Sequence, residues 1–531
     1  MAYYKDGIVE FARRLIALDW KILASGGTAK KLAEAGLPVT DIATIVGVPI
    51  LGHRVVSLSR EIHAGLLALN SEEHRAELAL HGILRIDLVL IDLYPLEQEL
   101  ARPSATLDSI LELEDIGGPT GLSSGAKGKR IVVCEPVDRE PVLTMIETGE
   151  PFSEDFREFL AAKADYVVSR YRMLTARYRG KGVFEALHGT RVAECLYGEN
   201  GYQVPAGLYQ GHTDDPLAIS RFKLVQGTAP SYNNWCDVDR MLQTITHIGA
   251  GFEVNASYFL MSPLVGLAVK HGNPCGGAYA GSADSIPLLR QVVEGDTLAI
   301  HGGLVMTNFP LDGDCAETLL QYATKGSWRL LDGVLAPSFG EGAIRQLQRK
   351  KDKCRLLANS ALLHTGVASL DTSRIFRPLR GGDFLVQPNY GYIPNFGDGS
   401  IVRYGPERSD LIPDLILAWG IGATSNSNTI TLVKDRMLIG NGVGQQDRVG
   451  AAELAIVRAR RSGHSVEGSV AFSDSFFPFP DGVEALIHAG VKAVFATSGS
   501  VNDRATIDAC VKKDVSLFMI PDKVGRGFFR H

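Results

Sequence analysis

Apolar residues recur along the chain with two spacings, and the two spacings alternate. Residues 8–16 carry apolar positions at the spacing of one helical face, and residues 21–24 then form a short apolar run typical of a strand. Two more apolar runs, at residues 86–95 and 130–136, each end in proline. Strands that alternate with helices predict a parallel, doubly wound α/β sheet in the first part of the chain.

The spacing becomes irregular between residues 181 and 216, where glycines crowd the sequence. We therefore place the main domain boundary near residue 195. Beyond it, a polar, turn-rich segment at residues 226–235 precedes further apolar runs that continue to the C-terminus. The second part of the chain is expected to have an α/β architecture as well.

Composition and charge narrow the class of protein. The chain has 531 residues, 45% of them hydrophobic, which is enough for roughly three domains with a core in each. A formal net charge of -6 gives no general electrostatic reason to bind nucleic acid or an anionic membrane. No segment reaches the ~20 apolar residues of a membrane span, and the first residues contain no apolar signal core. We expect a cytoplasmic protein.

The most distinctive chemistry follows an apolar run at residues 263–269. Lys270 and His271 come directly after this run, and the Pro/Gly-rich residues 272–277 are expected to end the strand. Ligands bind beyond strand ends in open α/β sheets, where a histidine can act as general base and a lysine can stabilise a developing oxyanion. The alternative left open by the residues alone is a solvated lysine beside a hydrogen-bonded core histidine.

A zinc site is not expected at this position. Pro274-Cys275 matches part of the zinc deaminase signature, but Ala278 stands where the second cysteine would be. Zinc needs about three protein ligands, and the seven cysteines of the chain show no metal-binding spacing. We expect reduced thiols and no metal.

Two glycine pairs in the first domain are candidate ligand sites. Residues 25–28 (Ser-Gly-Gly-Thr) join a strand to a helix expected to begin at Ala29, and backbone N–H groups at a helix N-terminus can hold phosphate. A simple tight turn is the alternative. Asp115 comes just before Gly117-Gly118, and as a bare motif it favours a helix cap.

Further along, the phenylalanines at 476, 477 and 479 could wall a pocket for a flat ring or belong to a core loop.

These segments resemble the bifunctional purine-biosynthesis enzymes that join an AICAR transformylase to an IMP cyclohydrolase. The matches extend from residue 5 to residue 531 in the order of the family. The strongest are Ser25-Gly26-Gly27-Thr28-Ala29-Lys30, Asp115-Ile116-Gly117-Gly118-Pro119-Thr120, Lys270-His271 with Asn273-Pro274-Cys275-Gly276, Ser425-Asn426-Ser427, and Phe476-Phe477-Pro478-Phe479 with Asp481.

The resemblance implies a methylglyoxal-synthase-like cyclohydrolase domain with a parallel sheet at residues 1–195. It implies a transformylase domain at residues 196–531, built from two cytidine-deaminase-like α/β lobes at about 196–365 and 366–531. The reaction implied is transfer of a formyl group from 10-formyltetrahydrofolate to the amine of AICAR, followed by ring closure to IMP. The family also implies a homodimer and small-molecule substrates, with no metal, nucleic acid or membrane.

Roles follow by matched position. The resemblance implies that His271 removes the amine's proton, that Lys270 stabilises charge on the formyl oxygen or the departing folate nitrogen, and that Asn426 orients the reactants. Further matched positions near the transformylase substrates are Asn234, Gly302, Gly303, Asp332, Phe476 and Asp481. Those in the cyclohydrolase-like site are Ser25, Gly26, Gly27, Thr28, Arg54, Tyr94, Asp115 and Lys127.

The chain departs from the family pattern at charged positions. Val56 stands where the family has a catalytic lysine, Tyr209 stands for an arginine, and Gly527 stands for another arginine with Arg526 one step away. We therefore predict weak cyclisation and a weak hold on a ribose phosphate. The alternatives are a relative that formylates a different amine and a catalytically silent protein that senses a phosphorylated metabolite.

Overall fold

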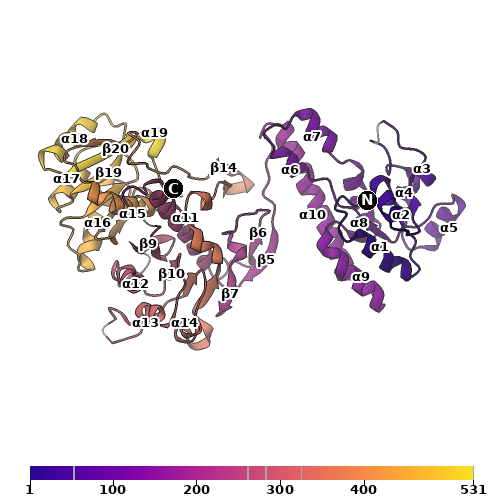
Figure 1. Ribbon diagram of the computed structural model, residues 1–531, viewed down its shortest axis with the longest axis horizontal. Helices are drawn as coiled ribbons and strands as arrows, with labels where there is room; N and C mark the ends of the chain where they lie inside the picture. The colour runs from indigo at the N-terminus through magenta and orange to yellow at the C-terminus, as the bar shows by residue number, and fades with distance from the viewer. Residues whose placement is uncertain (52–53, 260–261, 282–283, 325, 530–531) are drawn as a thin grey trace. The chain divides into compact units, whose positions relative to one another are not determined.

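The structure, a computed structural model, describes residues 1–51, 54–259, 262–281, 284–324 and 326–529. The chain forms two compact units, Met1–His188 and Gly189–His531 (Figure 1). The division lies a few residues before residue 195, where the composition placed the domain boundary. None of the helices within the described ranges is long and apolar enough to cross a membrane.

The first unit contains two parallel pairs of short strands, β1 with β2 and β3 with β4. The apolar runs thus form parallel strands as predicted, although each strand is shorter than its run. The strands are β1 (Leu23–Ala24), β2 (Thr40–Asp41), β3 (Leu88–Leu90) and β4 (Ile131–Val133). The helices are α1 (Ile8–Ala17), α2 (Gly26–Glu34), α3 (Ala43–Val46), α4 (Arg60–Leu67), α5 (Glu72–Leu80), α6 (Leu96–Leu100), α7 (Leu107–Leu113), α8 (Gly117–Lys127), α9 (Arg139–Thr148) and α10 (Glu154–Arg179).

Small residues let α8 lie close to β3. An added Cβ at Gly121 would lie 2.7 Å from Ile91 Cδ1, and one at Gly125 would lie 2.5 Å from Val89 Cγ1. These glycines are four residues apart and therefore share one face of the helix. Any larger side chain there would push α8 away from the strand, so the spacing of the glycines fixes the position of this helix.

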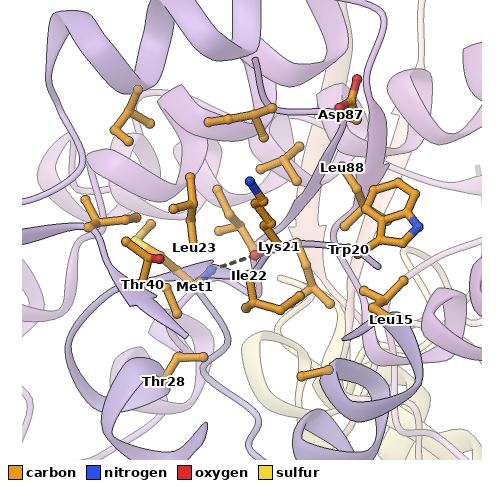
Figure 2. Close-up of a pocket in the computed structure, with 18 of the residues that line it drawn as sticks. Met1, Leu15, Trp20, Lys21, Ile22, Leu23, Thr28, Thr40, Asp87 and Leu88 are labelled. Atoms are coloured by element: carbon orange, nitrogen blue, oxygen red, sulfur yellow. Dashed lines mark hydrogen bonds between the residues drawn. The ribbon is translucent and has the colours of Figure 1, made fainter. Parts of the chain in front are cut away.

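A cavity of about 580 Å³ lies between β1 and β3 (Figure 2). Its lining is largely apolar and includes Leu15, Ile22, Leu23 and Leu88. The first residue enters this space along β3, because the Met1 ammonium donates to Leu90 O at 2.7 Å and Asp92 N donates to Met1 O at 3.1 Å. The cavity is thus mainly apolar, with Lys21, Arg85 and Asp87 as charged residues on its wall.

The second unit is organised around one sheet of 12 strands, in the order β15-β20-β19-β18-β16-β17-β9-β8-β10-β11-β12-β7. Six strands come from residues 223–358 and six from residues 402–521. The two halves meet where Met437 of β17 pairs with Ala278 of β9. The strands are β7 (Lys223–Gln226), β8 (Leu264–Lys270), β9 (Asn273–Ala280), β10 (Leu304–Thr307), β11 (Gly333–Ala336), β12 (Arg355–Ala358), β15 (Val402–Tyr404), β16 (Ile430–Lys434), β17 (Met437–Gly442), β18 (Val470–Ser473), β19 (Ala493–Ser498) and β20 (Ser516–Pro521).

Helices cover both faces of this sheet. Alternate residues of β8 join different cores: Leu267 packs in the cluster that contains α11 and α15, whereas Ala268 packs in the cluster that contains α12. All residues of α15 are buried, as expected of a helix that is apolar all round. The helices are α11 (Tyr232–Val254), α12 (Ser285–Glu294), α13 (Gly313–Gln321), α14 (Glu341–Leu347), α15 (Ile412–Gly422), α16 (Arg448–Arg461), α17 (Asp481–His488), α18 (Asp503–Lys512) and α19 (Asp522–Gly525).

Two pairs of strands lie outside the large sheet. They are the antiparallel hairpins of β5 (Thr190–Cys195) with β6 (Ala206–Gln210) and of β13 (Arg374–Pro378) with β14 (Phe384–Pro388). Both carry exposed apolar side chains, among them Val192 and Leu385.

The strand ends at Lys270 as predicted, but the Pro/Gly-rich residues that follow continue from Asn273 as a second strand. Only His271 and Gly272 form a turn, and β9 begins at Asn273 and pairs antiparallel with β8. The glycines in β9 serve close packing instead. A Cβ at Gly276 would collide with the carbonyl oxygen of Val292 in α12, and one at Gly277 would lie 2.9 Å from Ile421 Cδ1 in α15. Glycine in a strand can mark close approach of a neighbour as well as a turn.

Candidate active site

His271 lies at the tip of a two-residue hairpin between β8 and β9. Its φ is 56° and that of Gly272 is 70°. Two positive φ values are the mark of a type I′ turn, the turn that best matches the twist of a β-hairpin. This conformation suits glycine but is unfavourable for histidine. The His271 side chain is exposed, so the interpretation as a core histidine was wrong.

A carboxylate from α11 holds this turn in place. Asp237 Oδ1 accepts the backbone N–H of Gly272 at 2.6 Å. Burial raises the pKa of Asp237, while the backbone N–H groups of the turn and the nearby His271 oppose that rise. The tip of the hairpin is therefore anchored to a helix rather than left as a free loop.

Lys270 contacts the loop that precedes β10. Its Nζ donates to the carbonyl of His301, and a Cβ added to Gly302 would lie 3.8 Å from that nitrogen. Asp332 N donates to Gly303 O at 3.0 Å. The structure thus brings Lys270, Gly302, Gly303 and Asp332 together at one end of the strands β8, β10 and β11.

The strand order explains this grouping. Leu304 pairs with Val269 in β8, which is antiparallel, and with Gly333 in β11, which is parallel. Lys270 therefore ends β8 where β10 and β11 begin. The site lies at the carboxyl end of β8 but at the amino ends of its neighbours, unlike a site in an all-parallel sheet. The Asp332 carboxylate accepts from Arg349 Nη1 at 3.1 Å, so it is partly neutralised.

Asn426 follows α15 and is held by Arg240 of α11. Arg240 Nη2 donates to Asn426 Oδ1 at 2.7 Å and to Phe529 O at 3.1 Å, and Nη1 donates to Thr424 O. The guanidinium also lies over the Phe529 ring, 4.8 Å from its centroid. Arg240 is only 4% exposed. Its buried charge is compensated by carbonyl oxygens and an aromatic face.

Asn441 in β17 links the hairpin to the segment of Asn426. Its Nδ2 lies 3.1 Å from Pro274 O and 3.4 Å from Ser425 Oγ, while its Oδ1 accepts from Thr431 Oγ1 at 2.8 Å. Asn441 is nearly buried. The hairpin and the Asn426 segment, far apart in sequence, are thus tied together by one amide.

A cavity of about 310 Å³ opens beside the hairpin. Asp296 and Arg458 on its wall lie 3.4 Å apart. Cys275 also lines it, but burial raises the pKa of this thiol to about 12, so it is not a thiolate nucleophile near neutral pH. The polar lining residues are Lys270, His271, Asn273, Cys275, Asp296, Asn441 and Arg458.

Asn234 has a structural role in the first turn of α11. Its N–H donates to Ser231 Oγ at 3.2 Å and its Oδ1 accepts from Ser231 N at 3.1 Å, which makes a capping box. Its side-chain oxygen is therefore occupied by the helix end. Asn234 shares α11 with Asp237 and Arg240, and its hydrogen bonds join it to Ser231.

The three phenylalanines do not form one wall. Phe477 is 1% exposed in the core, Phe479 is 62% exposed, and Phe476 is half-buried with the Arg526 guanidinium 5.9 Å from its ring. Asp481 begins α17 and is exposed, with Oδ1 accepting from Gly482 N at 2.7 Å. Phe476 and Asp481 are thus accessible to a ligand on this side, whereas Phe477 is not.

In the first unit, α2 begins at Gly26 rather than at Ala29 as the sequence indicated, and Ser25 is its N-cap residue. Space is open around Gly26 and Gly27, since a Cβ added to either would meet nothing within 4 Å. Thr28 faces inward, where its Oγ1 accepts from Lys5 Nζ at 2.8 Å. The Gly-Gly turn could therefore hold an anion at the helix N-terminus.

Asp115 is a helix cap in this structure, because Oδ1 accepts the N–H of Gly118 at 2.8 Å at the start of α8. Burial raises the pKa of Asp115. Burial and this carboxylate also raise the pKa of the Tyr94 phenol, whose ring meets Tyr3 edge to face at 5.7 Å. Asp115 and Tyr94 therefore share one environment.

One position of the cyclohydrolase-like site, Lys127, lies apart from Asp115. Lys127 is the last residue of α8, and Asp115 caps the first turn, so about 15 Å of helix separates them. Lys127 lies in a surface depression with Glu158 and Asp165 of α10. Arg54 is exposed and pairs with Glu112 at 2.7 Å.

Sequence reasoning missed Asp237, Arg240 and Asn441. Arg240 lies between Val238 and Met241, which are both fully buried. Arg240 could have been identified from the sequence, because a charged residue within the apolar face of a predicted helix needs a buried partner. Among the described residues, no group of three His, Cys, Asp or Glu side chains is placed to hold a metal ion.

The fold defines a two-unit α/β protein, and comparison with known proteins gives its family. Residues 127–458 match the family model of the AICARFT/IMPCHase bienzyme, and residues 7–120 match that of the MGS-like domain. The chain belongs to the AICARFT/IMPCHase bienzyme family. The resemblance found in the sequence is thereby confirmed, as is the methylglyoxal-synthase-like first domain.

Relatives match along nearly the whole chain. The bifunctional purine biosynthesis protein PurH of Oceanobacillus iheyensis is 34% identical over 524 residues, which cover 97% of this chain and 96% of the relative. The PurH of Acetivibrio thermocellus is 32% identical over 538 residues, covering 99% and 98%. A solved structure described as the crystal structure of ForH is 32% identical and covers 35% of this chain and 96% of its own, with a TM-score of 0.32.

Proposed function

We propose that the second unit transfers a formyl group from 10-formyltetrahydrofolate to the amine of AICAR, and that the first unit carries a weakened IMP cyclohydrolase site. The observation that carries the proposal is the Lys270-His271 hairpin tip. It is exposed to a ligand, anchored by Asp237, and tied through Asn441 to the segment of Asn426. The family to which the chain belongs supports the reaction type.

His271 is proposed as the general base. As the amine nitrogen bonds to the formyl carbon, His271 takes a proton from that nitrogen, and the bond from the formyl carbon to the folate nitrogen breaks. General base catalysis contributes about 10²–10⁴-fold to such a step. An exposed imidazole on an anchored turn meets both requirements, access and a fixed position.

Lys270 is proposed to stabilise the oxyanion and to protonate the leaving folate nitrogen. Its ammonium donates to the His301 carbonyl, and it has two further N–H donors. One can therefore reach substrate while the carbonyl fixes the side chain. Gly302 next to it presents no side chain, which leaves room for a reactant.

Phe476 and Asp481 are proposed to line the folate side. Phe476 offers a half-buried ring and Asp481 an exposed carboxylate at the start of α17. A flat pteridine ring favours an aromatic neighbour and hydrogen-bonding groups. Asp332 lies at the same end of the strands as Lys270 and is proposed to face the acceptor.

A weak hold on the acceptor's phosphate is also proposed. Tyr209 is 60% exposed on β6, and Arg526 is paired with Asp522 at 2.6 Å. Gly527 cannot be replaced by arginine without repacking, because a Cβ there would collide with the Tyr390 hydroxyl. Reintroducing an arginine at 527 is therefore not a usable test, and a change of the acceptor is the better one.

The proposed cyclohydrolase site lacks its lysine, because Val56 stands in that position. Asp115 and Tyr94 lie together, and the open Gly26-Gly27 turn is proposed to receive the ribotide's phosphate. A valine supplies no charge for the developing oxyanion. Ring closure is therefore proposed to be slow.

The homodimer and the cytoplasmic location stay proposals. The exposed apolar side chains of the two outlying hairpins, among them Val192, Phe384 and Leu385, support an interface between two chains. Light scattering after gel filtration would give the mass in solution, and a monomer at micromolar concentration would contradict the dimer.

The test of the function is an assay with 10-formyltetrahydrofolate and AICAR, in which tetrahydrofolate is followed by absorbance and FAICAR by chromatography. The same assay with the AICAR nucleoside, which lacks the phosphate, measures the hold on the phosphate. Formation of tetrahydrofolate and FAICAR in equal amounts is expected. Absence of both products with a folded protein would refute the proposed transferase.

A further inference from the structure

We propose that Arg240 and Asp237 are positioning residues that set the two parts of the transferase site from a single helix, and that Arg240 makes Asn426 a hydrogen-bond donor to substrate. This inference rests on the proposed formyl transfer. It adds Asp237 and Arg240 to the site and assigns Asn426 the role of hydrogen-bond donor.

The orientation of Asn426 follows from the chemistry of its partner. An asparagine amide has one acceptor oxygen and one donor nitrogen, and the two are easily exchanged in a structure. A guanidinium has donors only. The atom of Asn426 that lies 2.7 Å from Arg240 Nη2 must therefore be the oxygen, and the NH₂ group points away from Arg240.

Arg240 is itself fixed by several contacts. Its guanidinium donates to two backbone carbonyls, those of Thr424 and Phe529, and lies over the Phe529 ring. The Arg240 backbone carbonyl accepts from Thr244 Oγ1 at 2.9 Å, and Thr244 Oγ1 lies 2.8 Å from Thr424 Oγ1. The side chain that aims Asn426 is thus locked from several directions.

Asp237 plays the matching role for the hairpin. It stands three residues before Arg240, one turn earlier on α11, so the two side chains lie on neighbouring parts of one helix face. Asp237 accepts the N–H of Gly272 at 2.6 Å. His271 needs this anchor because its positive φ is unfavourable.

The helix between them is rigid. α11 runs for 23 residues, and Val238, Met241 and Ile245 are fully buried. A single buried helix therefore fixes the distance between the base at the hairpin tip and the amide of Asn426. Small misplacements of reacting groups lower rates steeply, which makes this distance important for the transfer.

The direction of the hydrogen bond assigns a task to Asn426. With its oxygen held by Arg240, Asn426 can donate to an oxygen of the substrate, such as the formyl oxygen or the acceptor's carboxamide oxygen. It cannot take the proton of the amine. Proton removal then falls to His271.

The first experiment uses Asn426→Asp, which keeps an oxygen for Arg240 and removes the NH₂ donor. We expect kcat for formyl transfer to fall by about 10²–10³-fold, the loss typical of one oxyanion donor, with smaller changes in KM. Arg240→Met is expected to lower kcat as well, and Arg240→Lys, which restores one donor, is expected to recover part of the loss. An Asn426→Asp variant with wild-type kcat would overturn the donor assignment.

The second experiment does not depend on activity. Hydrogen exchange read by mass spectrometry is expected to rise at residues 424–428 in Arg240→Met and at residues 270–274 in Asp237→Ala, which removes the acceptor of the Gly272 N–H. Asn233→Ala, an exposed change in the first turn of the same helix, is the control and is expected to leave both segments unchanged. Unchanged exchange in both test variants would refute the positioning roles, whereas an inactive wild type with the expected exchange would refute only the proposed reaction.

Discussion

Replacing His271 with alanine tests the chemistry of the site with little effect on the fold. The side chain is exposed at the hairpin tip, and alanine keeps the same unfavourable positive φ. Surface substitutions of this kind change the free energy of unfolding by about 0.5 kcal/mol or less. The change is therefore expected to leave the thermal unfolding temperature nearly unaltered.

The activity is expected to fall by about 10²–10⁴-fold, because that is the usual contribution of a general base. This corresponds to about 2.7–5.5 kcal/mol on the activation barrier, several times the expected effect on folding. The assay follows tetrahydrofolate formation at saturating AICAR and 10-formyltetrahydrofolate, with unfolding followed by circular dichroism.

His271→Gly is the matched control. Glycine adopts φ 56° without the cost of a left-handed residue, about 1–2 kcal/mol, but loses more entropy on folding, about 0.5–1 kcal/mol. The glycine variant is thus expected to be at least as stable as the alanine variant and equally inactive. If either variant keeps more than about a tenth of wild-type turnover, His271 is not the base.

Three further outcomes are expected. The first unit is expected to form IMP from supplied FAICAR slowly, and Val56→Lys is expected to raise the rate. Rapid IMP formation by the wild type, measured by chromatography, would show that Val56 does not slow ring closure. Gly276→Ala lowers the free energy of unfolding by about 1–3 kcal/mol because its Cβ meets Val292 O, whereas Gly27→Ala, in open space, changes it little; equal denaturant midpoints would contradict this packing argument. Asp414 accepts from Tyr279 Oη at 2.8 Å and burial raises its pKa, so its contribution to stability is present at low pH and is lost as pH rises through that raised pKa. Asp414→Asn is therefore expected to gain stability relative to the wild type from pH 4 to pH 8 in thermal unfolding, and a constant difference would refute this linkage.

Local patterns predicted the elements that depend on local sequence. The strand that ends at Lys270 was visible in the spacing of apolar residues. β9 was not, because glycines that allow helices to approach a strand look the same in a sequence as glycines that turn the chain. The deciding contacts, with Val292 and Ile421, lie far away along the chain.

The candidate site divides in the same way. Lys270 and His271 could be found because two polar residues end an apolar run. Arg240 and Asn426 could not be paired from the sequence, because 186 residues separate them and only tertiary packing brings them together. Lys127 shows the reverse case: a matched position in the sequence, yet separated from Asp115 by the length of α8.

Because β9 and β17 pair with each other, the two halves of the large sheet depend on one another to fold. α11 from the first half and α15 from the second pack in one core, and Asn441 from the second half binds Pro274 in the first. Each half alone would expose a sheet edge and an apolar helix face to water. A chain cut within the exposed residues 397–399 would thus yield two fragments, each lacking part of the site, and only their reassociation would rebuild it.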